Sequence, residues 1–463
     1  MRYLSTRGQA PELGFCDAVL AGLASDGGLY LPAEWPQFSH AEISALANRP
    51  YEDAAFAIIS RFVDGEIEDA KLRGMIDAAY SSFRHPSVAP LVEIEPGHFI
   101  LELFHGPTLA FKDVAMQLLA RLMDYILEER GARATIVGAT SGDTGSAAIE
   151  AFKGRENTDI FILHPNGGTS EVQRRQMTTV LDANVHNIAL EGTFDDCQNA
   201  VKAMFANRPF RESLHLSGVN SINWGRIVAQ IVYYFTAAIS LGAPHRPVSF
   251  TVPTGNFGDI FAGYAAMRMG LPIARLIIAT NQNDILARTL ETGAYETGRV
   301  LRSISPSMDI QVSSNFERLV FDALERDADT LQRLMNQLKQ SGRFELPENA
   351  RLFISRTFSA GRASEDETLA TISSVNEQSD YLLDPHSAVG VQVARRFASV
   401  ETPMITLATA HPAKFPAAVK SASGLEPALP QWLSDLFERQ EQFDVLANDQ
   451  SLIEDYIKAR ARA

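Results

Sequence analysis

The sequence predicts an α/β protein with two lobes, in which helices flank parallel sheets, behind a mostly helical N-terminal region. Patterns of buried strands and of helices alternate in two series, one starting near residue 134 and the other near residue 247. Strands that are separated by helices pair in parallel, with right-handed crossovers. The apolar content of 46% and the charged content of 21% are those of a globular chain, and 463 residues suffice for two or three domains.

The first 95 residues are expected to be mostly helical. Ser39 and Glu42 have the spacing of a capping box, and helical patterns follow as far as Ala79. Glycines at 27 and 28 predict a turn into a short strand. Residues 89–92 then form the passage into the next unit.

Two alternating series of elements follow. In the first, buried strands are predicted at 135–140, 159–163 and 185–190. Between the second and third of these strands, Ser170 and Gln173 have the spacing of a capping box. In the second, a long apolar helix is predicted at 222–241, and strands at 247–252, 275–280 and 403–408. We therefore predict four parts: an N-terminal mostly helical region (1–95), a larger α/β domain (96–130 and 208–423), a smaller α/β domain (131–207) and a C-terminal helical tail (424–463).

Composition argues against several classes of function. The 41 basic and 56 acidic side chains give a net charge of −15, which disfavours nucleic-acid binding. The two cysteines, Cys16 and Cys197, predict neither a disulfide framework nor a cysteine-based zinc site. The ten histidines lack metal-ligand spacing, so no metal is expected. Without a signal-peptide core or a run of about 18 apolar residues, we expect no membrane contact and a cytoplasmic location.

Lys112 stands at an unusual place for a lysine. It follows an apolar strand and a Gly-Pro turn at 106–107, and it opens a helical pattern that runs to about Ile126. The first turn of a helix carries partial positive charge, which lowers the pKa of an amine placed there. Such an amine is suited to act as a nucleophile. The alternative is an exposed lysine beside a capping Asp113.

Three loops carry groups that suit anions. Loop 255–259 (GNFGD) follows a strand, and its glycines and free N–H groups suit a phosphate, although a plain turn uses the same residues. Loop 141–145 (SGDTG) offers hydroxyl and backbone donors to an anion such as a carboxylate, or else caps a helix. Residues 220–226 open another helix, and Arg226 there is either a phosphate ligand or a surface arginine.

A poised lysine, a glycine loop and a second anion site together indicate pyridoxal 5'-phosphate as the cofactor. That cofactor needs a lysine for its aldehyde, a cradle for its phosphate and a partner for its ring nitrogen. Thr409, at the carboxyl end of the last strand, is the candidate for the ring nitrogen, and Phe111 is either a candidate for the ring face or a core residue. No dinucleotide-binding, Walker, nucleophile-elbow or metalloprotease motif suggests another chemistry.

The sequence resembles the threonine synthases, in the longer form found in many bacteria and fungi. The motifs that carry the resemblance are residues 3–8, 26–32, 105–113, 139–147, 220–224, 252–259 and 409–415, in the family's order. The resemblance implies a pyridoxal-phosphate enzyme of fold type II, the tryptophan synthase β-like group. It also implies the conversion of O-phospho-L-homoserine and water into L-threonine and phosphate, the last step of threonine biosynthesis.

The resemblance further implies roles for individual residues. Lys112 would be the catalytic residue and the covalent anchor of the cofactor. The other implied cofactor-binding residues are Phe111, Gly255, Asn256, Phe257, Gly258, Asp259 and Thr409. The implied substrate-binding residues are Ser141, Gly142, Asp143, Thr144, Asn220, Ser221 and Arg226. Many relatives in the wider fold group have Asn where this chain has Asp143, so we expect Asp143 to accept hydrogen bonds from neighbours while backbone N–H groups bind the substrate anion.

Two alternatives remain open at this point. One is a lyase that acts on the same phosphohomoserine with the same cofactor and releases 2-oxobutyrate. The other is a cofactor-free scaffold, which the presence of Lys112 and of the glycine loop disfavours. In either enzymatic reading the partner is a small-molecule substrate, without nucleic acid or membrane, and the protein is a monomer or a homodimer.

Overall fold

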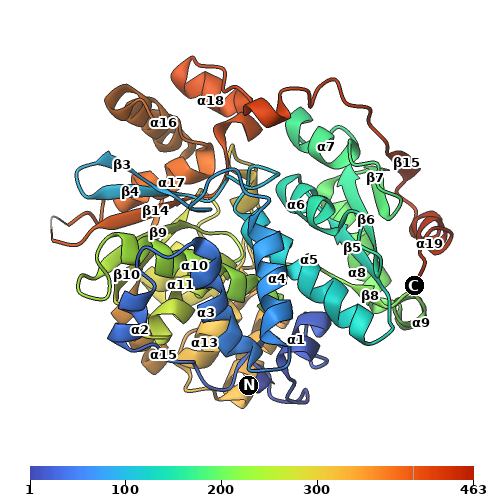
Figure 1. Cartoon of the computed structure of the whole chain (residues 1–463), viewed down its shortest axis with the longest axis horizontal. Helices are drawn as coiled ribbons and strands as arrows, with labels where there is room; N and C mark the ends of the chain where they lie inside the picture. The colour runs from blue at the N-terminus through green and yellow to red at the C-terminus, as the bar shows by residue number, and fades with distance from the viewer. Residues whose placement is uncertain (400) are drawn as a thin grey trace.

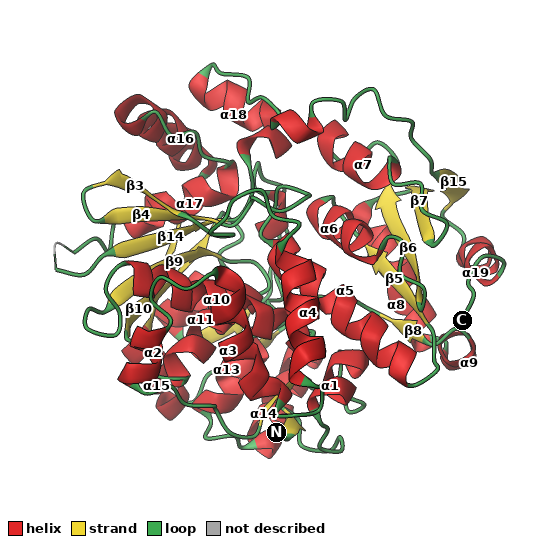
Figure 2. Cartoon of the chain, in the orientation of Figure 1, coloured by secondary structure: helices red, strands yellow, loops and turns green. Residues whose placement is uncertain are grey.

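The computed structural model describes residues 1–399 and 401–463, and its strands form two main sheets (Figure 1). One sheet has six strands and the other has five. Figure 2 shows the two sheets on opposite sides of the molecule, with helices around and between them. The predicted two-lobed α/β class is confirmed.

The N-terminal region is mostly helical, as predicted. Strands β1 (Tyr3–Ser5) and β2 (Tyr30–Pro32) form a small antiparallel sheet. The helices are α1 (Phe15–Ala21), α2 (His40–Ala45), α3 (Tyr51–Val63) and α4 (Asp69–Tyr80). The predicted capping box of Ser39 and Glu42 is present at the start of α2. Helix α3 packs on α10 (Trp224–Ser240) and α4 on α5 (Lys112–Glu129), so this region covers the larger lobe.

The larger sheet is parallel except at one edge. Its strands are β3 (Leu91–Glu95), β4 (His98–Glu102), β9 (Val248–Pro253), β10 (Ile273–Thr280), β13 (Phe358–Arg362) and β14 (Met404–Ala408). They lie in the order β13-β10-β9-β14-β4-β3, and the β3–β4 pair alone is antiparallel. Along β10, Leu276 and Ile278 belong to one hydrophobic cluster whereas Ile277 and Ala279 belong to another. Successive side chains of a strand point to opposite faces, so both faces of the sheet are buried.

Helices cover both faces of this sheet. Helix α11 (Gly258–Arg268) packs on one face together with α10, and α17 (Pro385–Ala394) packs on the other. The remaining elements of the larger lobe are α12 (Ile285–Thr292), α13 (Phe316–Ala323), α14 (Ala328–Ser341), α15 (Glu348–Thr357), α16 (Glu365–Ser379), α18 (Pro416–Ser423) and the short pair β11 (Ala294–Glu296) and β12 (Arg343–Glu345).

The smaller sheet is parallel throughout. Its strands are β5 (Ala134–Ala139), β6 (Thr158–Pro165), β7 (Val185–Glu191), β8 (Leu216–Ser217) and β15 (Asp444–Ala447), in the order β15-β7-β6-β5-β8. Its helices are α6 (Asp143–Phe152), α7 (Glu171–Thr178), α8 (Phe194–Ala206), α9 (Arg208–Ser213) and α19 (Gln450–Lys458). The capping box predicted at Ser170 and Gln173 opens α7.

The C-terminal tail is less helical than predicted. Beyond residue 424 it contains one α-helix, α19, and the strand β15 at the edge of the smaller sheet. The pairing of β15 with β7 joins residues more than 250 positions apart in the sequence, a distance at which local patterns carry no signal. The tail therefore completes the smaller lobe, and the larger and smaller sheets both include residues from beyond 400.

Helix α5 joins the two lobes. It packs against α6 of the smaller lobe and against α10 of the larger lobe, and Figure 1 shows it between the two sheets. Its first residue, Lys112, therefore lies where the lobes meet. Among residues 1–399 and 401–463, no helix combines the length and the apolar character needed to cross a bilayer.

Candidate active site

A cavity of about 440 Å³ lies at the carboxyl ends of β5, β9 and β14, where the loops of both lobes meet. This is the usual position of a ligand site in open α/β sheets. The predicted site residues that line it are Phe111, Lys112, Ser141, Asp143, Thr144, Asn220, Ser221, Arg226, Gly255, Asn256, Phe257, Gly258, Asp259 and Thr409. Gly142 is buried but does not line the cavity, and a Cβ atom there would approach Gln173 Cδ to 2.3 Å.

Lys112 is buried at the first position of α5. Its Nζ lies 4.7 Å from the centre of the Phe111 ring and 3.4 Å from Asp143 Oδ2. Burial lowers the pKa of the Lys112 ammonium, Asp143 opposes this effect, and the positive charges of Lys414 and Arg226 add to the lowering. The exposed-lysine alternative is thus wrong, and burial is a larger cause of the lowered pKa than the sequence alone indicated.

The segment before Lys112 is held rigidly. The backbone N–H and hydroxyl of Thr108 donate to the two oxygens of Asp113, at 2.8 Å and 2.7 Å. Gly106 passes so close that a Cβ atom there would lie 2.5 Å from the Cβ of Asp113. The Phe111 N–H donates to the carbonyl of Thr409 at 2.9 Å, which fixes Lys112 next to the end of β14. Burial raises the pKa of Asp113 to about 6, although the two hydrogen bonds from Thr108 act to lower it.

The carboxylate of Asp143 contacts four polar side chains in and around the cavity. Its Oδ1 lies 3.0 Å from Lys414 Nζ and accepts a 2.8 Å hydrogen bond from the side-chain amide of Gln173. Its Oδ2 faces Lys112 and the hydroxyl of Ser307, which is 3.5 Å away. Burial alone would raise the pKa of this carboxyl, but Lys414 and Lys112 together bring it well below the usual range. Asp143 therefore accepts hydrogen bonds from neighbouring side chains, as expected.

Loop 255–259 turns sharply from β9 into α11. Phe257 has a left-handed backbone conformation with φ of 65°, and α11 begins at the next residue, Gly258. A Cβ atom at Gly255 would lie 2.8 Å from the carbonyl oxygen of Ser307, so the loop accepts only glycine there without displacement. The first N–H groups of α11 have no acceptor within the helix, which suits them to a phosphate.

Asp259 sits in the first turn of α11. Its Oδ1 accepts hydrogen bonds from Tyr233 at 2.5 Å and from Tyr234 at 3.0 Å. Its Oδ2 is buried and has no hydrogen-bond partner within the part of the chain that the structure describes. Burial raises the pKa of Asp259 to about 6, although the two tyrosines and the nearby cations Lys112 and Arg226 act in the opposite direction.

Arg226, in the first turn of α10, is buried rather than exposed, so the surface-arginine alternative is wrong. One terminal nitrogen, Nη1, donates to the carbonyl of Val219 at 3.1 Å. The Nε atom is buried without a hydrogen-bond partner among the described residues. Burial lowers the pKa of the guanidinium to about 10, which leaves it charged at neutral pH. A buried cation with an unused donor is suited to bind an anion.

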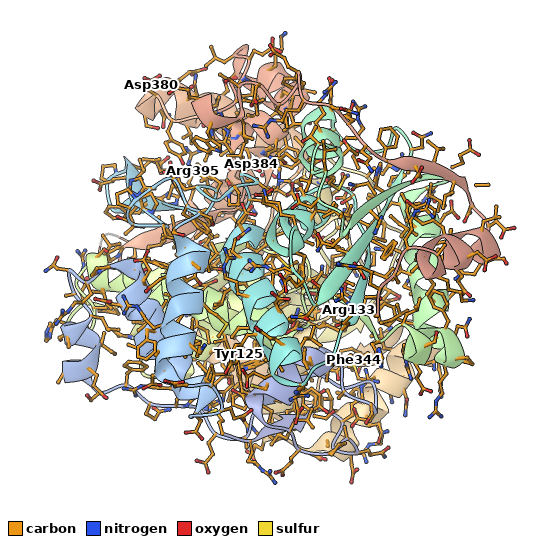
Figure 3. All side chains as sticks on the ribbon, turned by 45° about the vertical axis from the view of Figure 1, so that its right-hand side comes forward. Tyr125, Arg133, Phe344, Asp380, Asp384 and Arg395 are labelled. Carbon is orange, nitrogen blue, oxygen red and sulfur yellow. The ribbon has the colours of Figure 1, made fainter. Side chains whose placement is uncertain are left out.

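Thr409 is tied to a buried hydrogen-bond chain on α17. Its N–H donates to the hydroxyl of Ser387 at 3.2 Å, and that hydroxyl donates to Asp384, which Figure 3 labels at the start of α17. Asp384 also binds Nδ1 of His386 at 2.7 Å, and His386 Nε2 accepts the N–H of Ser307 at 3.2 Å. These hydrogen bonds thus link the end of β14 to the loop that contains Ser307, which lines the cavity.

Several of these groups were not predicted from the sequence. Lys414 lies only five residues after Thr409, and a lysine directly behind the last strand was the signal available for it. Gln173 was recognised only as a helix cap, because the sequence does not show that its amide reaches Asp143. The contacts of His386 and of the tyrosine pair join residues far apart in the sequence, and no local pattern indicates them.

The residues present fit pyridoxal phosphate. Lys112 provides a buried amine of lowered pKa, and Gly255 stands where a Cβ atom would not fit without displacement of the facing loop. Two buried polar atoms of the same cavity, Asp259 Oδ2 and Arg226 Nε, have no hydrogen-bond partner among the described residues. Within the described residues, no group of three or more His, Cys, Asp or Glu side chains is arranged to hold a metal ion.

Comparison with known proteins agrees with this chemistry. Residues 84–402 match the model of the family described as "Pyridoxal-phosphate dependent enzyme". The protein is therefore a pyridoxal-phosphate-dependent enzyme of the two-lobed α/β type. Residues 2–80 match "Threonine synthase N terminus", and residues 387–457 match "Threonine synthase, C-terminal".

Relatives along the whole length narrow this class further. Threonine synthase from Pseudomonas aeruginosa is 53% identical, over 99% of this chain and 98% of that protein. A pyridoxal-phosphate-bound threonine synthase structure from Brucella melitensis is 63% identical, with a TM-score of 0.99 and full coverage of both chains. The yeast enzyme's structure is 40% identical, with a TM-score of 0.95, over 99% of this chain and 98% of that one. The chain belongs to the threonine synthase family.

Proposed function

We propose that the protein converts O-phospho-L-homoserine and water into L-threonine and phosphate, with Lys112 as the residue that holds the cofactor. The observation that carries this proposal is that the Lys112 amine and the Arg226 guanidinium, both buried, face one cavity of about 440 Å³. An amino acid with a phosphate on its side chain needs both groups, one for the chemistry at carbon and one for the leaving anion.

Lys112 is proposed to move protons on the substrate. Bound pyridoxal phosphate supplies the electron sink that makes protons at Cα and Cβ of an amino acid removable. The Lys112 amine takes the Cα proton, a Cβ proton leaves next, and the bond from Cγ to the phosphate oxygen breaks. One of the two removed protons goes to Cγ and the other to the departing phosphate, and water then adds its hydroxyl to Cβ and its proton to Cα. The lowered pKa of Lys112 favours the unprotonated amine that such transfers require.

The remaining groups are proposed to bind and orient. The loop of Gly255, Asn256, Phe257 and Gly258, with Asp259, would hold the cofactor's phosphate at the start of α11. Thr409 would face the ring nitrogen, and Phe111 would flank the ring.

The start of α6 would receive the substrate's carboxylate on the backbone N–H groups of Ser141, Asp143 and Thr144. The N–H of Gly142 instead donates to the hydroxyl of Thr140 at 2.9 Å. Asn220, Ser221 and Arg226 would hold the substrate's phosphate through its departure.

The deciding experiment is incubation of the purified, cofactor-loaded protein with O-phospho-L-homoserine. Threonine and phosphate should appear in equal amounts. Lys112→Ala should abolish both products together with the absorption band of the lysine-bound cofactor. A second candidate, the lyase, would release 2-oxobutyrate and phosphate in equal amounts without threonine, and that outcome would replace the proposal.

We also propose that the protein acts in the cytoplasm as a monomer or a homodimer, and that the chain divides near residues 130 and 424. The other predicted boundaries need correction, because β3 lies in the larger sheet, and the smaller sheet includes β8 from beyond residue 207 and β15 from the tail. Gel filtration with light scattering measures the oligomeric state, and a tetramer would contradict the proposal. Limited proteolysis should cut first near residues 130 and 424, and cuts within β5–β7 would argue against this division.

A further inference from the structure

A second buried lysine, Lys414, shares the carboxylate that faces Lys112. The side chain of Lys414 is fully buried at the end of the short 3-10 helix Pro412–Lys414, which follows β14. Its Nζ lies 3.0 Å from Asp143 Oδ1 and donates a 2.7 Å hydrogen bond to the carbonyl of Thr108. Lys112 Nζ lies 3.4 Å from the other oxygen of Asp143. One buried carboxylate therefore stands between two buried ammonium groups.

The arrangement has a consequence for the charge of Lys112. An amine must lose its proton before it can attack an aldehyde. If Lys112 were the sole cation beside Asp143, its deprotonation would leave a buried carboxylate without a counter-charge, which is costly. Lys414 removes this obstacle because it stays beside Asp143 when Lys112 becomes neutral. The positive charge of Lys414 also lowers the pKa of Lys112 directly.

Lys414 is also well placed to keep this geometry fixed. Its backbone carbonyl accepts a 3.4 Å hydrogen bond from the hydroxyl of Ser170, the capping residue of α7. Its ammonium binds Thr108, which precedes Lys112 by four residues, and Asp143, which opens α6. The single side chain thus joins the segment that carries Lys112 to the start of α6 in the smaller lobe.

We propose that Lys414 is a positioning residue for the cofactor lysine: it supplies a second counter-charge to Asp143, so that Lys112 is free to become the neutral amine that binds pyridoxal phosphate. The proposal rests on the role proposed above for Lys112. In the step that it favours, Nζ of Lys112 bonds to the aldehyde carbon, and the two amine protons leave with the aldehyde oxygen as water.

Other charged groups surround this trio, and they stay the same in every variant compared below. Arg226 of α10 lowers the pKa of Lys112, and Lys112 in turn acts to lower the pKa of Asp259 of α11. His386 of α17 faces Asp143, and Asp113 of α5 faces Lys414.

The test follows the uptake of pyridoxal phosphate by the cofactor-free protein as a function of pH. Stopped-flow absorbance gives the rate, and borohydride reduction with peptide mass analysis confirms that the adduct is on Lys112. The midpoint of the rate profile reports the pKa of the Lys112 amine, because only the unprotonated amine reacts. The variants are Lys414→Met, which keeps the bulk and removes the charge, Asp143→Asn, and the two combined.

The signs of the expected shifts distinguish an electrostatic role from a purely structural one. Lys414→Met should raise the midpoint by about one pH unit or more, so that uptake below the midpoint becomes about tenfold slower. Asp143→Asn should lower the midpoint, and the double variant should return it close to that of the wild type. Lys420→Met is the matched control, because Lys420 is exposed on α18 and pairs with Glu426 at 2.8 Å. It should leave the profile unchanged.

Specific results would overturn the proposal. A Lys414→Met midpoint within 0.2 pH units of wild type, or one that moves in the same direction as that of Asp143→Asn, contradicts it. If Lys414→Met does not fold, the double variant decides, because it buries no unpaired carboxylate. The double variant must fold, and its rate profile must have the midpoint of the wild type. If it does not fold, or if its midpoint differs, the proposal is overturned. Lys112→Ala identifies a different failure, because an undiminished adduct in that variant refutes the role of Lys112 rather than that of Lys414.

Discussion

Replacing Asp259 with asparagine should stabilise the cofactor-free protein above pH 6. Asp259 Oδ1 accepts both tyrosine hydroxyls, whereas Oδ2 is buried without a partner among the described residues. Asparagine has nearly the same shape, and its amide oxygen can keep both hydrogen bonds. It carries no charge, so D259N removes the cost of burying a carboxylate and leaves the packing nearly intact.

The gain in unfolding free energy expected for D259N follows from the pKa of Asp259. Burial raises the pKa of Asp259 from 3.8 to about 6, and a difference of about 2 units corresponds to about 3 kcal/mol. Because the pKa of Asp259 is higher in the folded state, the buried side chain does not lower the free energy of unfolding while it is protonated. The wild type loses about 3 kcal/mol of unfolding free energy as the pH rises from about 4 through 6. For 463 residues, an unfolding entropy of about 1 kcal/mol/K makes the difference about 3 °C in Tm.

The assay is the Tm of cofactor-free wild type and D259N from pH 4.5 to pH 8, in buffers of constant ionic strength. The Tm difference should be small at pH 4.5, grow through pH 6 and then remain constant. Asp455→Asn, which makes the same charge change at an exposed position of α19, is the control and should show no such growth. A D259N protein that is less stable than wild type at pH 8, or a difference independent of pH, would refute the reasoning.

Three further substitutions test the site. Arg226→Ala should raise the KM for O-phospho-L-homoserine about tenfold or more, while the cofactor's Kd changes less than about twofold; equal losses would count against a substrate-phosphate role. Gly255→Ala places a Cβ 2.8 Å from a backbone carbonyl of the facing loop, so fluorescence titration should show cofactor affinity reduced about tenfold or more. Gly106→Ala places a Cβ 2.5 Å from that of Asp113 and should cost about 1–3 kcal/mol, seen as a lower Tm. Gly74→Ala, where a Cβ meets no atom within 4 Å, is the control for both glycine variants, and an equal effect there would contradict the steric argument.

The parts of the fold and site that local sequence determines were predictable. Alternating strand and helix patterns gave the class, because burial on both faces of a parallel sheet leaves continuous apolar strands such as β9 and β14. Lys112 and loop 255–259 were identifiable because each combines a strand end, a turn and a helix start within a few residues. The capping boxes at Ser39 and Ser170 were found for the same reason.

What the sequence could not show are the contacts between distant segments. Asp143 is 271 residues from Lys414, and Asp259 is 26 residues from Tyr233, with a strand and two turns between them. Burial decides the charge of these groups, and burial is a property of the packed lobes rather than of any motif. The edge strand β15 was not predicted either, because its pairing with β7 depends on the path of the tail around the smaller lobe.

The three buried carboxyls of the site show how one fold gives the same residue type different charges. Asp143 contacts two ammonium groups, and its pKa falls well below the usual range. Asp113 and Asp259 accept hydrogen bonds from hydroxyl and backbone groups, which do not offset burial, and the pKa of each rises to about 6. The charge of Asp143 is thus balanced within the protein by the lysines. The positive charge of Arg226 and the helix starts is then left to act on a ligand, and a doubly charged phosphate gains most from it.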